Sequence, residues 1–495
     1  MGGLPQKIKN AFSLHFEDFS TGVDSTTSKS LRRSFLESSV AGVMGVFTGG
    51  IVLTGYAIAL GANEFIFGLL TAIPAAANLF QIQASRVLER SGERRRLVLR
   101  FATAHRLMWI VIALVPFLPL GRWEQYRIWI FLLVFSIAGL LGLFSGVPFL
   151  SWLIDLVPQN IRGRFFAIRT FMGGTVGILL GIGAGKFIDF WKAADIGGEV
   201  VSFSILMIIG AGFGLWSVSI LSKLHHPRFT KPKTVGPFLH ALREPFQNES
   251  YRRLFVFRVL TDLAGGVAAP FFGLYMLTSA RLGFTFIATL ATVSTLVNLL
   301  TLPTWGKLCD RYGYKPVIAI CIGGKALFTV LWLFTSPETI WLFVLIHVLG
   351  AFDAGLGIAI PNLIYKTVPQ ERRSLYIAVD GSVVGIAATV APLLGGILAG
   401  VVQHLDVSLG AIHIDHLKFI FLLSTLLRVI TFPFLRRVTE PKAARPVDVI
   451  RVLLPFRDID IFEGFQQMVQ LFLAPVRYIR DRVSLEKEDS ELDQE

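Results

Sequence analysis

Long apolar stretches dominate this sequence, and each is long enough to cross the hydrocarbon core of a bilayer. Twelve such stretches are expected, near residues 34–60, 64–87, 97–119, 127–156, 164–190, 199–223, 254–279, 284–307, 316–335, 339–367, 374–403 and 414–435. Of the 495 residues, 53% are hydrophobic and only 16% are charged, whereas a soluble chain carries about 25% charged residues. The pattern therefore predicts an all-α polytopic membrane protein with twelve transmembrane helices.

A long basic connection divides these stretches into six and six. The sequence thus predicts five regions: an N-terminal cytoplasmic segment (1–33), a six-helix bundle (34–223), a central cytoplasmic loop (224–253), a second six-helix bundle (254–437) and a cytoplasmic tail (438–495). In the tail, apolar residues between Ile461 and Phe472 recur at helical spacing, which predicts a helix on the membrane surface. The acidic end, 486–495, is expected to be disordered.

Lysine and arginine are distributed unevenly between alternate connections. With a cytoplasmic N-terminus, the inner segments through Arg373 hold 27 of these residues and the outer connections hold six. Because basic residues concentrate on the cytoplasmic side, both termini are predicted to be cytoplasmic, in a multi-pass protein of the cell or inner membrane. The net charge of +13 is then a topology signal, so the expected partners are the lipid bilayer and a small molecule, and no nucleic acid is expected. We expect a monomer.

Two short motifs recur in both halves of the chain. Residues 85–94 (SRVLERSGER) match residues 306–315 (GKLCDRYGYK) at a shift of 221 residues. Residues 157–159 match residues 368–370 (both VPQ) at a shift of 211. Within each half, the first motif follows the second stretch and the other follows the fourth. Such internal repetition is typical of transporters built from two related bundles.

At these motifs the chain resembles the major facilitator superfamily of secondary transporters. That family carries Gly-x-Leu-x-Asp-Arg-x-Gly-Arg-Arg between its second and third helices, often with an echo between the eighth and ninth. Here the echo is the better copy, since the first copy has Ser85 for glycine and Glu89 for aspartate. The resemblance covers about residues 30–437. It implies twelve helices in two pseudo-symmetric six-helix bundles that work by alternating access.

The charges of these motifs can form a latch that closes the inner face. A carboxylate is stabilised at the positive N-terminus of a neighbouring helix, arginines pair with surface carboxylates, and glycines supply tight turns. The resemblance implies an inner-gate motif made of Glu89, Arg90, Gly92, Arg94, Asp155, Gly306, Asp310, Arg311, Gly313 and Lys315. The alternative is that these loops only set topology.

Four acids lie inside the expected spans and are candidate coupling residues: Asp353, Asp262, Asp380 and Glu37. An ionisable group in a membrane is a functional hypothesis by default. Asp353 lies near the middle of its span and is the first candidate for exchanging a proton during transport. The alternative is a structural acid bonded to a neighbouring helix.

Basic residues in the spans provide expected partners for these acids. Asp262 follows Arg258 by four residues, and Glu37 follows Arg33 by four, which favours an ion pair near the inner gate within each helix. The alternative for both acids is a role as substrate ligands. Arg169 occupies the repeat position of Asp380, which raises the hypothesis of a pair across the halves. Three other bases, Arg106, Lys325 and Arg428, lie on helices that the resemblance places outside the cavity, where snorkelling or packing is expected.

Polar side chains in the second, eighth and tenth spans are candidate substrate contacts: Asn78, Gln81, Asn298 and His347. The amides are equally expected as hydrogen-bonding glue between helices. His347 is expected more as a packing residue than as a proton carrier.

The resulting hypothesis is a secondary transporter of a small organic solute, with a proton or ion as an optional co-substrate. Residues 391–396 (APLLGG) resemble an antiporter motif, which favours export. The alternative is a transporter-like sensor or scaffold that acts through its loop and tail. Cys309 and Cys321 have no metal-ligand spacing, and no nucleophile–base arrangement or ATP-binding motif is visible. Neither an enzyme nor a cofactor or metal site is therefore expected.

Overall fold

The computed structural model describes residues 25–227, 244–369, 373–409, 412–441 and 443–453. Among these residues, twelve continuous or interrupted helices are long and apolar enough to cross a membrane. The prediction of an all-α protein with twelve membrane spans is confirmed. The expected tail helix and the acidic end lie outside the described residues.

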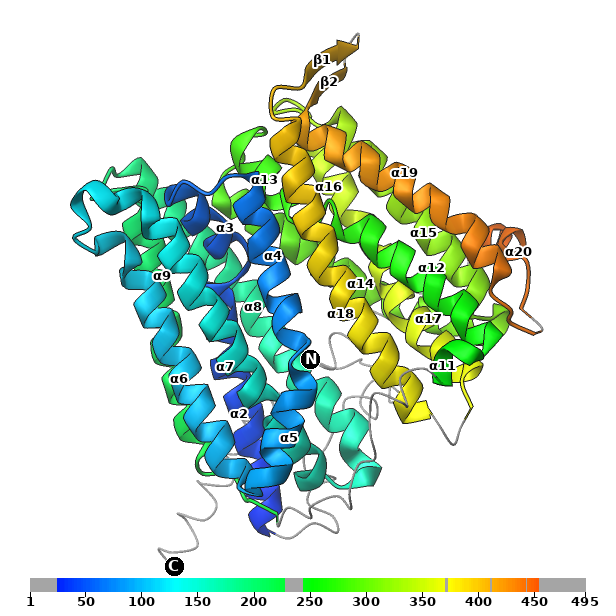
Figure 1. The fold of residues 1–495 in the computed structure, drawn as a ribbon, viewed down its shortest axis with the longest axis horizontal. Helices are drawn as coiled ribbons and strands as arrows, with labels where there is room; N and C mark the ends of the chain where they lie inside the picture. The colour runs from blue at the N-terminus through cyan, green and yellow to red at the C-terminus, as the bar shows by residue number, and fades with distance from the viewer. Residues whose placement is uncertain (1–24, 228–243, 370–372, 410–411, 442, 454–495) are drawn as a thin grey trace, which may run out of the picture.

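The first six spans lie between residues 25 and 221 (Figure 1). Spans 1 and 2 are each made of two helices, α2 (Ser25–Thr48) with α3 (Gly50–Ala59) and α4 (Glu64–Asn78) with α5 (Gln81–Ser91). Spans 3 to 6 contain α6 (Arg94–Leu114), α7 (Arg127–Leu156), α8 (Arg162–Ala193) and α9 (Glu199–Leu221).

The second six spans follow α11 (Glu244–Gln247). Span 7 is α12 (Glu249–Gly266) with α13 (Phe271–Thr278), span 8 is α14 (Phe284–Tyr312), and span 9 contains α15 (Tyr314–Leu331). Span 10 is α16 (Ile340–Val348) with α17 (Ala351–Thr367), span 11 is α18 (Arg373–Val401), and span 12 is α19 (His416–Arg437). An antiparallel hairpin of β1 (Asp406–Leu409) and β2 (Ile412–Asp415) joins spans 11 and 12, and α20 (Pro446–Leu453) follows span 12.

Local chemistry explains where several helices begin and break. Span 1 breaks at Gly49 and Gly50, where Gly50 has a φ of 51° that favours glycine. Span 7 breaks before α13, next to Pro270, which has no backbone N–H to donate. The first described helix, α2, is present from Ser25, nine residues before the expected apolar stretch, because a helix can continue beyond the bilayer into polar surroundings.

The two ends of the spans differ, and we name them by their features. The hairpin face carries β1 and β2, and the motif face carries the two repeated loops that contain Gly92 and Gly313. The two six-helix groups meet towards the hairpin face and diverge towards the motif face (Figure 1). The contact runs along α4 against α18 and α8 against α14.

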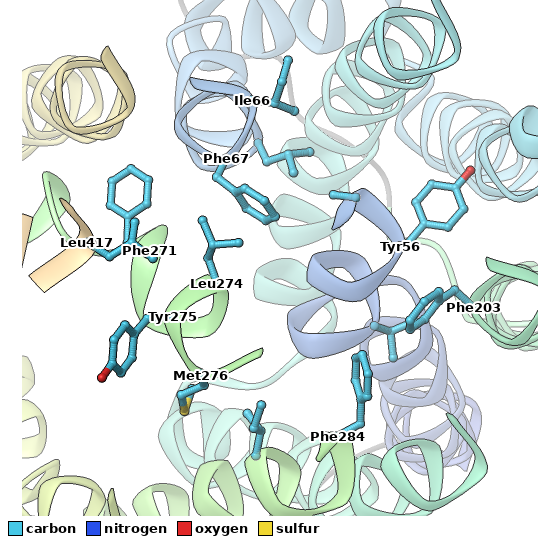
Figure 2. Packing of buried hydrophobic residues seen from close by; sticks show 14 of the residues in the cluster. Tyr56, Ile66, Phe67, Phe203, Phe271, Leu274, Tyr275, Met276, Phe284 and Leu417 are labelled. Atoms are coloured by element: carbon cyan, nitrogen blue, oxygen red, sulfur yellow. The ribbon is translucent and has the colours of Figure 1, made fainter. Parts of the chain in front are cut away.

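The distribution of buried side chains follows the same division. One hydrophobic cluster joins both halves near the hairpin face, with Tyr56 and Phe203 from the first half and Phe271 and Phe284 from the second (Figure 2). Phe203 and Phe284 are in ring contact across the halves, with centroids 5.5 Å apart. Two further clusters lie towards the motif face, and each draws its members from one half alone. The halves are therefore packed together at one face and separate at the other.

Candidate functional site

Glycines allow the close approach that seals the hairpin face. A Cβ on Gly68 would lie 2.6 Å from the carbonyl oxygen of Pro392, and one on Gly396 would lie 2.9 Å from that of Glu64. A Cβ on Gly185 would lie 2.8 Å from the backbone of Phe284. Any larger residue at these positions would force the halves apart.

A carboxylate from the first half also binds the start of a helix in the second half. Asp189, near the end of α8, accepts the backbone N–H of Phe284 at 2.9 Å and that of Thr285 at 2.8 Å. These are the first residues of α14, so the negative charge lies at the positive end of its dipole. Glu64 and His416 form a second contact across the halves, at 3.2 Å. Neither contact was predictable from the sequence, because Asp189, Glu64 and His416 are not part of a motif.

The motif face has ion pairs inside each half. In the first half, Arg94 at the start of α6 is fully buried and pairs with Asp155 at the end of α7, at 2.5 Å. Arg94 also donates to the carbonyl oxygen of Pro227, in the segment after span 6. Burial and the neighbouring Arg94 lower the pKa of His226, so this imidazole is neutral at pH 7. The pair of Arg94 and Asp155 therefore ties together the ends of three spans at the motif face.

The second half uses a different acid for the same purpose. Lys315 and Lys366 occupy the repeat positions of Arg94 and Asp155, so both positions are basic. Glu440, which follows span 12, supplies the missing anion and bonds to Lys366 at 2.9 Å. Its carboxylate also accepts the backbone N–H groups of Tyr314 and Lys315 at the start of α15, at 3.2 and 2.7 Å. Sequence reasoning missed Glu440, which lies three residues beyond the assigned second bundle.

Removing the charge of Glu440 should loosen the motif face of the second half. We expect Glu440→Gln to lose about 1.5–3 kcal/mol of stability, because the charged acceptor serves one ammonium and two backbone N–H groups. Hydrogen exchange at the start of α15 measures the effect, with Glu93→Gln, in an exposed pair, as the control. Unchanged exchange at Tyr314 and Lys315 would contradict this role.

Each of the two repeated motifs spans the end of one helix and the turn that follows it. Gly92 and Gly313 have φ values of 66° and 94°, so both make the expected tight turns. Gly306 has open space around an added Cβ, which agrees with a serine at this position in the first copy. The latch made of Glu89, Arg90, Asp310 and Arg311 therefore remains a proposal.

A cavity of about 590 Å³ lies within the second half, between spans 7, 9, 10, 11 and 12. Apolar side chains such as Phe272 and Leu356 form part of its wall. Six charged residues also line it: Arg258, Asp262, Lys325, Asp353, Asp380 and Arg428. Its volume is typical of a site for a small molecule.

Asp353, the first candidate for coupling, forms an ion pair inside this cavity. Its carboxylate lies 2.9 Å from the ammonium of Lys325, whose side chain is 14% exposed, while that of Asp353 is 52% exposed. Arg428 is only 7% exposed and also lines the cavity. The expectation that Lys325 and Arg428 are mere snorkelling or packing residues is therefore wrong, because spans 9 and 12 reach the cavity at these positions.

The pairs expected near the motif face are present only in part. Arg258 and Asp262 form the expected pair, with 3.2 Å between Nε and Oδ2. Glu37 instead pairs with Arg169 on α8 at 2.7 Å, while Arg33 donates to the carbonyl oxygen of Lys223. The hypothesis of a pair between Arg169 and Asp380 is therefore wrong, because Arg169 lies against the buried acid of its own half.

The candidate substrate contacts lie apart from this cavity. Asn78 and Gln81 are exposed at the break between α4 and α5. The amide of Asn298 donates to the carbonyl oxygen of Ser294 on its own helix, at 2.9 Å. His347 Nδ1 lies 2.7 Å from the carbonyl oxygen of Phe343, and its ring contacts Trp332. None of the four lines the 590 Å³ cavity.

The chain is similar in sequence to known transport and resistance proteins. A family model described as Major Facilitator Superfamily matches residues 254–479. The multidrug resistance protein MdtG of Escherichia fergusonii is 29% identical over 285 residues, which is 55% of this chain and 65% of that protein. The tetracycline resistance protein, class H, of Pasteurella multocida is 27% identical over 110 residues, or 22% of this chain and 27% of that protein. The chain thus spans less than two thirds of either relative.

Solved structures share the fold at low sequence identity. The nucleoside transporter NupG gives a TM-score of 0.60 at 14% identity, covering 83% of this chain and 99% of that one. The xylose transporter XylE of E. coli, in an inward-open conformation, gives 0.59 at 13% identity, with coverages of 85% and 99%. These similarities establish two six-helix bundles in the arrangement of Figure 1.

Proposed function

We propose that this chain, which belongs to the major facilitator superfamily, is a secondary transporter that carries a small organic solute by alternating access. The observation that carries the proposal is a charged cavity of about 590 Å³ in a molecule whose described residues pack the two halves together near the hairpin face. A transporter of this kind must expose its site to one side of the membrane at a time. Sealing at the hairpin face and separation at the motif face fit one of those two states.

We place the motif face in the cytoplasm, because the basic connections lie there. The chain would then be in its inward-open state. A cysteine at Gly163, exposed at the motif face, should react with an impermeant maleimide only after the cells are permeabilised. A cysteine at the hairpin residue Ser408 should react in intact cells. The opposite labelling pattern would reverse the orientation.

The pair between Lys325 and Asp353 supports coupling of transport to a proton. Protonation of Asp353 would break its ion pair with Lys325, and so would an incoming charged solute. Proton and solute can therefore compete for the same two side chains, which is the requirement for exchange. Export is supported by the antiporter-like residues 391–396 and by the two relatives, which are a tetracycline and a multidrug resistance protein.

The charge of Asp353 should govern how solute binding depends on pH. We expect solutes found in a thermal-shift screen of metabolites and drugs to bind the native chain differently at pH 5.5 and pH 8. In Asp353→Asn the difference should disappear, because the exchangeable proton is gone. Asp195→Asn, on an exposed connection, is the control. Equal pH dependence in both variants would contradict proton coupling through Asp353, and the absence of any solute would count against transport.

A further inference from the structure

The six charges in the cavity fall into two groups by their interactions. Asp353 interacts with Lys325 and also acts electrostatically on Arg428. We call these three residues the cation pole, because two bases surround one acid. Asp380 and Asp262 both interact electrostatically with Arg258. We call these three residues the anion pole, because two acids share one base. The charged residues that line the cavity thus sum to zero, with an excess of base at one pole and of acid at the other.

Arg428 carries the excess charge of the cation pole. It makes no ion pair with any described residue, and its Nε is buried without a hydrogen-bond partner. Its guanidinium lies beside Gly265, where an added Cβ would be 3.2 Å from Nη2. The carboxylate of Asp353 is already paired with Lys325, so the buried guanidinium of Arg428 has no acid of its own, which is costly. Its planar shape matches a carboxylate through two parallel hydrogen bonds. The cation pole is therefore built for an anionic group.

The anion pole has the opposite excess. Asp262 Oδ2 lies 3.2 Å from Arg258 Nε, yet it is buried and has no hydrogen bond of good geometry. Arg258 also acts electrostatically on Asp380, which lines the same cavity, so one base is shared by two acids. At the repeat positions of the first half, Glu37 and Arg169 form a matched pair instead. The second half thus departs from the balanced arrangement, and it does so at the cavity.

We infer that the solute of this cavity is a small zwitterion, with its carboxylate at Arg428 and its ammonium group between Asp262 and Asp380. This inference rests on the proposed transport function and specifies its substrate class. Gly265 marks the cation pole on α12, and Asp262 is one helical turn away, so the poles are about 5 Å apart along the axis. That separation suits amino and carboxylate groups on one small skeleton. Phe272 in the wall gives an apolar contact for the remainder.

Four probes with a common skeleton test the inference on the full-length chain in lipid nanodiscs. They are phenylalanine (zwitterion), its amide (cation), N-acetylphenylalanine (anion) and N-acetylphenylalanine amide (neutral). Binding is measured by tryptophan fluorescence and thermal shift, and the same four forms of leucine are used as a second skeleton. We expect the zwitterion to bind at least about tenfold more tightly than either singly charged form, because each singly charged form lacks one of the two charged contacts.

Variants at each pole should each remove one part of the preference for the zwitterion. Arg428→Gln should remove the advantage given by the carboxylate, and Asp262→Asn should remove that given by the ammonium group. Gly265→Ala keeps every charge but crowds the guanidinium, so it should weaken carboxylate binding even if Arg428→Gln folds poorly. Arg127→Gln, in a pair near the hairpin face, is the matched control and should change nothing.

Several results would overturn the inference. One is that neither the phenylalanine nor the leucine zwitterion binds, and another is that the anion binds as tightly as the zwitterion. A third is that Arg428→Gln and Gly265→Ala both keep the full preference for the zwitterion over the cation. If the screen then finds a singly charged solute that binds, transport still stands and only the zwitterion is rejected. If no solute binds and the two faces never exchange accessibility, the transport proposal itself fails.

Discussion

Replacing Arg169 with alanine should lower the stability of the protein by about 3–5 kcal/mol, because it leaves a buried carboxylate without its partner. Glu37 is 2% exposed and lies 2.7 Å from Arg169, whose side chain is 14% exposed. Arg106 also acts electrostatically on Glu37, but it makes no recorded ion pair with it. The contact joins α2 to α8, which also meet where Ser38 Oγ donates to the carbonyl oxygen of Arg169 at 2.7 Å.

Thermal unfolding in detergent and the monomer yield in size-exclusion chromatography measure this effect. The double variant Glu37→Gln with Arg169→Gln should recover most of the loss, since it removes both charges together. Arg127→Ala, which breaks an exposed pair with Glu124, should cost no more than about 1 kcal/mol. If the double variant is as unstable as Arg169→Ala, the loss comes from packing against Phe149 and not from the unpaired charge.

Asp189→Asn should raise the population of molecules that are open at the hairpin face by about tenfold or more. The change removes the charge from an acceptor of two backbone N–H groups at a helix N-terminus, which is worth about 1.5–3 kcal/mol. The asparagine amide also turns one donor towards a backbone donor. Because these bonds exist only while the halves touch at this face, their loss destabilises one state selectively. The variant should fold normally and differ in conformation.

Spin labels at Gln125 and Glu338 report the opening, since both residues are exposed at the hairpin face and belong to different halves. The distance distribution should gain a longer component in Asp189→Asn. Cys309 and Cys321 are buried and should remain unlabelled. Asp195→Asn is the control, because it removes an exposed charge from the connection that follows α8. Identical distributions in the two variants would show that Asp189 does not hold the face closed.

The number of spans was predictable because hydrophobic length is a local property. A bilayer requires about twenty apolar residues for each helix, and all twelve were found in the sequence and the structure. The tight turns at Gly92 and Gly313 were also predictable from their motif. The hairpin of β1 and β2 was not, because two four-residue strands leave too short a pattern to detect.

The pairing of charges was far less predictable. Arg258 and Asp262 are neighbours on one helix, so their spacing was sufficient. Lys325 and Asp353 lie on different helices and meet through packing, as do Glu37 and Arg169. Glu440 reaches α15 from beyond span 12, in a segment that no repeat covers. Each of these pairs depends on how helices rotate about their axes, and no sequence pattern in this chain encodes that rotation.

The sequence by itself determined the membrane environment, the twelve spans, the family resemblance and the presence of acids within the bilayer. These follow from composition, length and short motifs, which act within a few turns of helix. Only the tertiary structure decided which acid meets which base, which face is sealed and where the cavity lies. The physical reason is that a charge in the membrane interior is stabilised by partners on other helices, and those partners are set by the packing of the whole bundle.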